Sequence, residues 1–425
     1  MDTDRIVRDL GRRARSASRV LAGLTADQKN AVLAGMADAI DASAGEILAA
    51  NAADVAAAEE AGLTPASIDR LRLDSKRLAG VSAAVRDVAR LEDPVGKILS
   101  QSTRPNGLEI TKLRTPIGVV GIIYESRPNV TADAASLCIK TGNAVILRGG
   151  SESLRSNLAI SSAMARGGAA CGLPEGALQL VPVADREAVR AMAEMDEFLD
   201  VIVPRGGHAL IETVVRHARM PVIKHYNGIC AVYVDAAADP VMAARIAVNS
   251  KCQRPGVCNA METLLVHESA ADAFFREAAA GFEKFAVEAR ADERAARALA
   301  AAGYPGTLIV PAADSDWTTE FLAMKMAVKI VGGLREAIDH INTHGSHHSD
   351  AIVTGDPEAA EEFLAAVDSA AVYWNASTRF TDGGEFGFGA EIGISTDKLH
   401  ARGPMGLEEL TTYKYVVRGD GQLRQ

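Results

Sequence analysis

Two cysteines six positions apart, Cys252 and Cys258, stand out in the segment KCQRPGVCNA. They could form a metal clip, a disulfide loop, two buried thiols or a nucleophile on a turn. No second cysteine pair lies at zinc-like spacing, which disfavours a structural zinc site. A Pro-Gly pair breaks regular structure just before Cys258, and backbone N–H groups with a cation such as Arg254 would favour the reactive thiolate there. A small buried residue on a turn fits the same pattern.

The three other cysteines lie in apolar surroundings on expected helices or strands, where buried, unreactive thiols are usual: Cys138, Cys171 and Cys230. Five cysteines in a chain of this length are no disulfide framework, and an odd number cannot all pair internally. A reducing compartment is therefore expected.

Two glycine pairs follow apolar strands at the entry to helices, in VPRGGHALIE and LRGGSES. Gly206 and Gly207 would let the backbone approach a ligand closely, and the helix N-terminus that follows favours an anion. The chain contains neither G-x-G-x-x-G nor a Walker A motif. On spacing alone, an anion site and an ordinary turn are equally open at both places.

Four histidines crowd into DHINTHGSHHSD: His340, His344, His347 and His348. The first two are four positions apart and could share one face of a helix. No cysteine lies near them in sequence, and there is no H-E-x-x-H motif. Polar loop residues after a helix are favoured over zinc, and no metal site is expected.

The composition bounds the class of protein. The 425 residues suggest two or three domains, and 45 basic against 55 acidic residues give a net charge of −10. This charge argues against nucleic acid as a partner, although one basic pocket could still hold an anionic substrate. The N-terminus lacks an apolar signal region, and no run of apolar residues is long enough for a membrane span. We expect a cytoplasmic, globular protein without membrane contact.

The pattern of expected secondary structure changes twice along the chain. Residues up to about 95 read as alanine-rich helices, one of them opened by a capping box of Thr25 and Gln28. Asn106-Gly107 then predicts a projecting hairpin, either a surface ornament or an oligomer contact. From about 117, apolar strands alternate with helices, which indicates two α/β domains with parallel sheets that join near 228–260. Ligands of such sheets collect at the carboxyl ends of strands.

Three long segments resemble the gamma-glutamyl phosphate reductase family, a branch of the aldehyde dehydrogenase superfamily: RPGVCNAMETLLVH, EAIDHINTHGSHHSDAIVT and GAEIGISTDKLHARGPMGLEELTTYKY. The resemblance covers nearly the whole chain and is weakest in the first 20 residues and in 285–303. It implies an aldehyde dehydrogenase-like α/β fold of two domains with a projecting β-hairpin oligomerisation element.

The resemblance also implies domain boundaries. Residues 1–104 and 117–232, with part of 365–385, would form a cofactor-binding domain. Residues 233–364 would form the catalytic domain, and 98–116 with 386–425 the hairpin and C-terminal oligomerisation element.

Site residues follow from the same resemblance. Cys258 matches the nucleophile, Cys252 has no role, and Ser126 or Asn129 would help to bind the oxyanion. Cations for the substrate phosphate and α-carboxylate would be Arg127, Arg254 and Arg402. Expected cofactor contacts are Arg148, Gly149, Gly150 and Ser151 in LRGGSES, Arg205, Gly206 and Gly207 in VPRGGHALIE, and Glu320.

The implied reaction is the NADPH-dependent reduction of L-glutamyl 5-phosphate to L-glutamate 5-semialdehyde and phosphate through a Cys258 thioester, in proline biosynthesis. The segment HYNG, His225–Gly228, stands where hydrolytic relatives carry a water-activating Glu and has no carboxylate. Glu152 complicates the choice of NADPH, since a carboxylate could bind ribose hydroxyls instead.

The resemblance further implies a homo-oligomer, a dimer or tetramer, and transient contact with glutamate 5-kinase. Two alternatives stay open: a thioester-forming dehydrogenase of another acyl donor, such as a coenzyme A ester, and a catalytically silent dinucleotide-binding scaffold.

Overall fold

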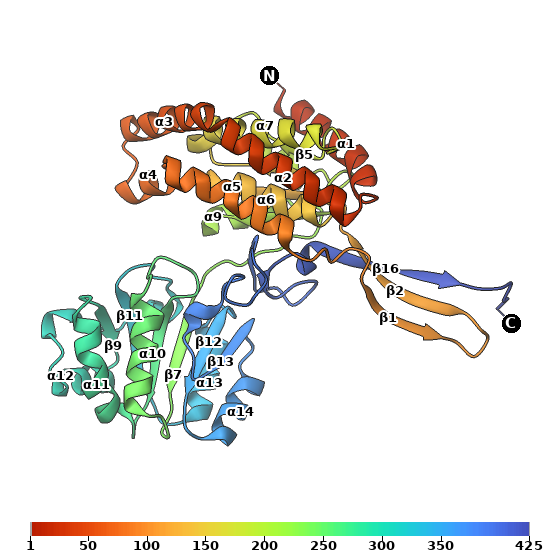
Figure 1. The fold of residues 1–425 in the computed structure, drawn as a ribbon. Coiled ribbons are helices and arrows are strands. Elements are labelled where there is room, and N and C mark those ends of the chain that lie inside the picture. The colour runs from red at the N-terminus through yellow and green to blue at the C-terminus, as the bar shows by residue number, and fades with distance from the viewer. Residues whose placement is uncertain (1, 425) are drawn as a thin grey trace. The chain divides into compact units, whose positions relative to one another are not determined.

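The computed structural model describes residues 2–424, and the chain in it divides into two compact units. The first holds the described residues up to Lys224, Gly387–Gly393 and those from Met405 onward; the second holds His225–Phe386 and Ile394–Pro404. Within residues 2–424, no helix has both the length and the apolar character to cross a bilayer. Figure 1 shows both units and labels many of their helices and strands.

The first unit begins with a layer of helices, as expected: α1 (Thr3–Leu21), α2 (Ala26–Ala42), α3 (Ala44–Glu60), α4 (Pro65–Leu71) and α5 (Ser75–Arg90). The capping box is confirmed, because the Thr25 side chain accepts from the Gln28 N–H while the Gln28 side chain accepts from the Thr25 N–H. Val32, Met36 and Ile40 line the buried face of α2.

The first unit also carries a four-stranded parallel sheet in the order β5-β4-β3-β6. Its strands are β3 (Val119–Tyr124), β4 (Ala144–Arg148), β5 (Leu178–Leu180) and β6 (Val201–Arg205), connected by α6 (Asn129–Lys140), η1 (Ser151–Ser153), α7 (Leu154–Ala170), α8 (Glu187–Ala193) and leading into α9 (His208–His217). The strands are almost wholly buried, which explains their continuous apolar sequences. Strand β4 lies on one side of β3 and β6 on the other, so the strand order reverses here, and ligands of such sheets bind at the carboxyl ends beside this point.

The second unit is built on a seven-stranded parallel sheet in the order β10-β9-β11-β8-β7-β12-β13. Its strands are β7 (Cys230–Val234), β8 (Met261–His267), β9 (Glu288–Ala291), β10 (Ile309–Pro311), β11 (Lys325–Val331), β12 (Ser349–Val353) and β13 (Ala371–Trp374). Its helices are α10 (Pro240–Cys252), α11 (Ala271–Glu283), α12 (Glu293–Ala301), α13 (Leu334–His344) and α14 (Pro357–Ala366), with short turns η2 (Gly306–Leu308), η3 (Asp314–Thr318) and η4 (Thr378–Phe380). Separate apolar clusters cover the two faces of the sheet.

One expected boundary differs from the structure. Part of 365–385 was expected in the first domain, but β13 pairs with β12 and the segment up to Phe386 belongs to the second unit. Strand pairing at the edge of a sheet depends on long-range contacts, which chain order does not reveal. The division after Lys224 also precedes the expected join near 228–260.

The expected hairpin is present. Strands β1 (Ile98–Thr103) and β2 (Glu109–Pro116) pair antiparallel, and Gly107 adopts a left-handed φ of 86° in the turn between them. Strand β16 (Thr411–Arg418) adds to β2 as a third strand, so the sheet exceeds the predicted hairpin (Figure 1). The last short elements are β14 (Gly393–Ser395), β15 (Gly403–Met405) and η5 (Glu408–Leu410). The role of the β1–β2 hairpin in oligomerisation stays a prediction.

Removing the capping box should destabilise the first unit. Thr25→Ala deletes the acceptor for the Gln28 N–H, and losing such a cap costs about 1 kcal/mol. We expect a lower midpoint in urea denaturation followed by circular dichroism. Ser43→Ala is the matched control, because Ser43 is the N-cap of α3 but makes no side-chain cap hydrogen bond. Equal losses in the two variants would contradict the assigned role of Thr25.

Candidate active site

Cys258 lies half-buried on the turn between α10 and β8. The backbone of Gly228 packs directly against it: a Cβ added to Gly228 would overlap the carbonyl oxygen and Cα of Cys258. Only glycine fits this approach. The structure therefore places the HYNG segment beside Cys258, as the resemblance implied.

A carboxylate nevertheless reaches this turn from the loop before β11. The N–H of Gly228 donates to Glu320 Oε1 at 2.9 Å, and burial raises the pKa of Glu320. Glu320 was expected as a cofactor contact, and in the structure its side chain holds the HYNG backbone. Gly228, Cys258 and Glu320 precede β7, β8 and β11, which are neighbours in the sheet. The candidate nucleophile thus lies at the amino ends of its strands, whereas the sequence analysis expected ligands at carboxyl ends.

A buried ion pair secures the segment that carries Glu320. Lys251 Nζ lies 2.6 Å from Glu262 Oε2, and Glu262 Oε1 accepts from the N–H of Leu322 at 3.2 Å. Both side chains of the pair are fully buried, and burial raises the pKa of Glu262 to about 7 despite its partner. Both oxygens of the Glu262 carboxylate are therefore used in structural contacts near Cys258.

The remaining cysteines differ in exposure and proton affinity. Cys230 is buried, and its thiol donates to the carbonyl of Cys258 at 3.2 Å; burial raises its pKa well above the ordinary value. Burial also raises the pKa of Cys252, to about 11, and that of buried Cys138. The expectation that Cys171 is buried was wrong, because it caps α7 where the chain turns out to solvent.

Two of the expected substrate cations lie in the second unit, in different settings. Arg254 sits in the turn that leads to Cys258, and no ion pair involves it within residues 2–424. Arg402 instead pairs with Asp368: Nη1 lies 2.9 Å from Oδ1, and Lys398 approaches the same carboxylate at 2.6 Å. These two cations lower the pKa of Asp368, the lysine first. The ion pair leaves Arg402 less available to a substrate than Arg254.

A segment that the sequence analysis missed is fastened to the Cys258 turn. Asn259, the next residue, donates to the carbonyls of Arg379 at 3.3 Å and Thr381 at 2.9 Å, and Thr378 Oγ1 donates back to the carbonyl of Asn259 at 2.8 Å. Behind it, the hydroxyls of Ser250 and Ser377 lie 2.9 Å apart. No local motif marks this segment, because its place depends on how the chain returns from β13.

The expected oxyanion donors belong to the first unit and already have partners there. The N–H and hydroxyl of Ser126 both donate to Glu152 Oε1, the former at 2.9 Å. Burial acts to raise the pKa of Glu152, but these hydrogen bonds outweigh it and the pKa is lowered. The Asn129 amide donates to Asp133 at 2.9 Å, and burial raises the pKa of Asp133 to about 6. Arg127 lies between these residues in the loop after β3.

The carboxyl ends of β4 and β6 suit a nucleotide. Arg148 is buried at the end of β4, donates to the carbonyls of Ala184 and Asp185, and keeps a buried Nε without a partner in the described chain. Gly149 and Gly150 leave no room for a Cβ, which would strike Asn157 and Glu152.

At the carboxyl end of β6, Gly207 precedes α9, and a Cβ at Gly207 would meet open space. Its N–H donates to Glu125 Oε2 at 3.0 Å. Arg205 packs against the backbone of Gly393, and Gly206 against the carboxylate of Glu125. Backbone N–H groups at a helix start favour an anion, and here the Glu125 carboxylate already accepts from that of Gly207.

Among residues 2–424, no group of three or more His, Cys, Asp or Glu side chains is placed to hold a metal ion. His340 is buried on α13 with its ring edge-on to Trp317, 5.4 Å between centroids, and 4.6 Å from the ring of His344. Burial lowers the pKa of His340 to about 4. His347 Nδ1 lies 2.6 Å from the carbonyl of Asp368.

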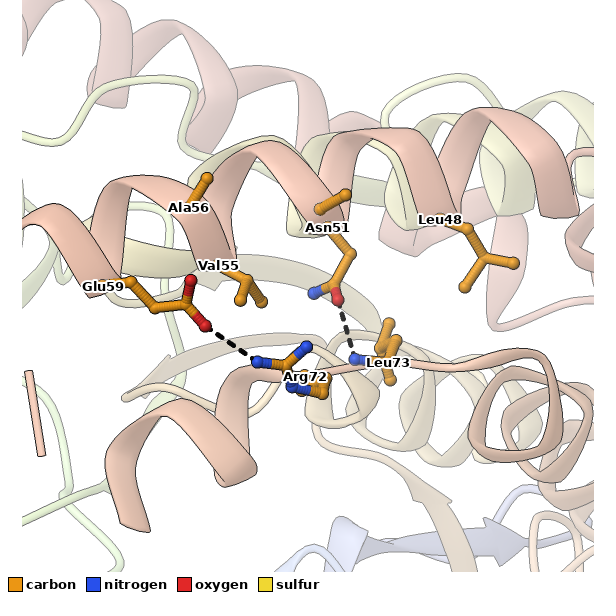
Figure 2. A pocket seen from close by; sticks show the side chains of 8 residues that line it. Leu48, Asn51, Val55, Ala56, Glu59, Arg72 and Leu73 are labelled. Atoms are coloured by element: carbon orange, nitrogen blue, oxygen red, sulfur yellow. Dashed lines mark hydrogen bonds and ion pairs between the residues drawn. The ribbon is translucent and has the colours of Figure 1, made fainter. Parts of the chain in front are cut away.

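A pocket of about 270 Å³ lies along α3 in the first unit. Arg72 and Glu59 pair across it at 2.9 Å, and Asn51 accepts from the Leu73 N–H at 2.7 Å (Figure 2). Its charged groups satisfy one another, which is typical of a packing gap beside a loop.

The chain belongs to the aldehyde dehydrogenase family, whose model matches residues 2–299. It is 54% identical over 419 residues to the gamma-glutamyl phosphate reductase of Moorella thermoacetica, covering 99% of each chain. It is 51% identical over 423 residues to the enzyme of that name from Paramagnetospirillum magneticum, covering 100% of this chain and 98% of the relative. The crystal structure of gamma-glutamyl phosphate reductase from Thermotoga maritima matches with a TM-score of 0.95 at 43% identity, over 99% of this chain and 100% of that one. The expected family and fold class are confirmed.

Introducing a side chain at Gly228 should disturb the Cys258 turn. The Cβ of Gly228→Ala would overlap the backbone of Cys258, and such overpacking costs about 1–3 kcal/mol. We expect a lower thermal midpoint and a changed rate of Cys258 alkylation by iodoacetamide, measured by peptide mapping.

Gly45→Ala, in α3, is the matched control because a Cβ there meets nothing within 4 Å. It should keep or slightly raise the midpoint, since alanine favours helix. A Gly228→Ala protein with the stability and labelling rate of the parent would show that the close approach is not a constraint.

Proposed function

We propose that this chain reduces L-glutamyl 5-phosphate to L-glutamate 5-semialdehyde with NADPH, in proline biosynthesis. The observation that carries the proposal is 51–54% identity over nearly the full length of chains named gamma-glutamyl phosphate reductase. Cys258 is half-buried on its turn, whereas Cys230 and Cys252 of the same unit are buried, which supports its choice as nucleophile.

In this proposal the Cys258 thiolate attacks the acyl carbon, and phosphate leaves with the electrons of its C–O bond. A thioester on Cys258 remains. Bound NADPH supplies the hydride that this reduction consumes. Collapse of the resulting thiohemiacetal returns the thiolate and releases the semialdehyde. Sulfur suits both halves, since it is a strong nucleophile and a good leaving group.

The backbone N–H of Cys258 is our first candidate for the oxyanion donor. Asn129 ranks ahead of Ser126 as a second donor. The single hydroxyl proton of Ser126 already goes to Glu152, whereas the Asn129 amide has a second N–H besides the one given to Asp133. Substrate anions would meet Arg254 first, with Arg127 and Arg402 as further candidates.

The residues at the ends of β4 and β6 would hold the cofactor. We assign Arg205, Gly206 and Gly207 to the diphosphate. Arg148, with Gly149, Gly150 and Ser151, would hold the adenosine ribose and its 2′-phosphate. Glu152 Oε1 already accepts two hydrogen bonds from Ser126, and Oε2 accepts one from Ser151 at 3.4 Å. This leaves Glu152 fewer acceptor sites for ribose hydroxyls, which supports NADPH over NADH.

The reaction is tested in reverse, with glutamate 5-semialdehyde, NADP and inorganic phosphate. We expect NADPH to accumulate steadily only with phosphate, because HYNG offers no base to hydrolyse the thioester. Cys258→Ala should abolish turnover, while Cys252→Ser, at a buried thiol, should keep most of it. Steady NADPH formation without phosphate, or an active Cys258→Ala variant, would overturn the proposal.

The cofactor assignment is tested at Arg148. Arg148→Ala should lower kcat/KM for NADPH at least about tenfold, since a charge-assisted hydrogen bond is lost, and change the value for NADH much less. Arg166→Ala, at an exposed arginine of the same unit, should change neither value. Equal losses with both cofactors would remove Arg148 from the 2′-phosphate site.

A further inference from the structure

We propose, on the basis of the function above, that Arg379 and Arg254 together bind the phosphate of the substrate beside Cys258, which makes Arg379 a specificity-determining residue. Arg379 was not among the residues that the sequence indicated. It lies in η4, far along the chain from the nucleophile.

The position of Arg379 is set by contacts to the Cys258 turn on both sides. Its guanidinium Nε donates to Gln253 Oε1 at 2.9 Å, and its carbonyl accepts from Asn259 at 3.3 Å. Gln253 and Asn259 flank the stretch that contains Arg254 and Cys258. The side chain is therefore held over the turn by its inner nitrogen, which leaves its terminal nitrogens for another partner.

Neither arginine has a carboxylate partner. Within residues 2–424, no ion pair involves Arg379 or Arg254, although the chain carries a net charge of −10 and arginines elsewhere pair widely. Asp382 is near, but its carboxylate accepts from the N–H groups of Gly384 and Glu385. Burial and the charge of Arg254 both lower the pKa of Arg379, while a Cys258 thiolate and, after it, the charge of Asp382 act against them. Two like charges that repel each other next to a nucleophile are stabilised when an anion binds between them.

The chemistry of the substrate selects which anion binds. The phosphate of an acyl phosphate is joined through one oxygen to the carbon that Cys258 attacks, whereas the α-carboxylate is three carbons further away. Two planar guanidinium groups offer paired donors to the terminal oxygens of a phosphate. They would also stabilise the charge that grows on the leaving phosphate.

The test measures phosphate in the reverse reaction. Arg379→Gln should raise the KM for inorganic phosphate at least about tenfold, as expected for a lost charge-assisted hydrogen bond, and leave the KM for semialdehyde nearly unchanged. Arg379→Lys keeps the charge without the fork and should fall between the parent and Arg379→Gln. Arg335→Gln, at an exposed arginine of the same unit, is the control and should match the parent.

A binding measurement keeps the proposal testable without turnover. Inorganic phosphate should slow iodoacetamide labelling of Cys258 in the parent and fail to do so in Arg379→Gln at the same concentration, with circular dichroism confirming that both are folded. A rise in the KM for semialdehyde alone would assign Arg379 to the α-carboxylate and overturn the inference. If the parent itself shows no phosphate dependence, the proposed function fails; if the parent depends on phosphate and Arg379→Gln behaves like it, only the role of Arg379 fails.

Discussion

The backbone contact between Gly228 and Cys258 is the constraint on which the candidate site depends. Strands β7 and β8 are parallel neighbours, with Cys230 opposite Met261, so the turns that precede them must meet at one edge of the sheet. That edge is crowded enough to exclude a Cβ at residue 228. The contact fixes the backbone of Cys258, the candidate nucleophile, against a residue that has no side chain.

Two carboxylates near Cys258 hold the surrounding loops in place through hydrogen bonds and an ion pair. Glu320 holds the Gly228 N–H, and Glu262 joins Lys251 to the segment that follows Glu320. Removing one partner of a buried ion pair leaves an uncompensated charge, so such pairs constrain geometry strongly even where they add little net stability. The same commitment argues against Glu262 as a base for thioester hydrolysis, since its oxygens already have two donors.

Charged side chains near the candidate site differ in whether they have a partner within the protein. The chain is acidic overall and pairs Arg402 with Asp368, yet among residues 2–424 no ion pair involves Arg254 or Arg379 near Cys258. In the first unit, by contrast, Glu152 Oε1 accepts two hydrogen bonds from Ser126. Local pairing thus decides which charged residues remain able to meet a ligand.

The sequence by itself determined the elements and the candidate nucleophile. The capping box at Thr25, the turn at Gly107 and the apolar strands are local signals, because caps, turns and strand burial depend on neighbouring residues. The Pro-Gly turn before Cys258 is equally local, and long family motifs identified the fold.

Only the tertiary structure decided which side chains are exposed or lack internal partners and so can meet a ligand. It placed β13 in the second unit, turned Cys171 to solvent, captured Ser126 and Arg402, and brought Arg379 to the Cys258 turn. Apart from the exposure of Cys171, these outcomes depend on partners distant along the chain: Arg379 and Gln253 are 126 positions apart. Hydrogen bonds and ion pairs of that kind form only when the sheet brings the ends of separate strands together, and no local pattern in the sequence encodes them.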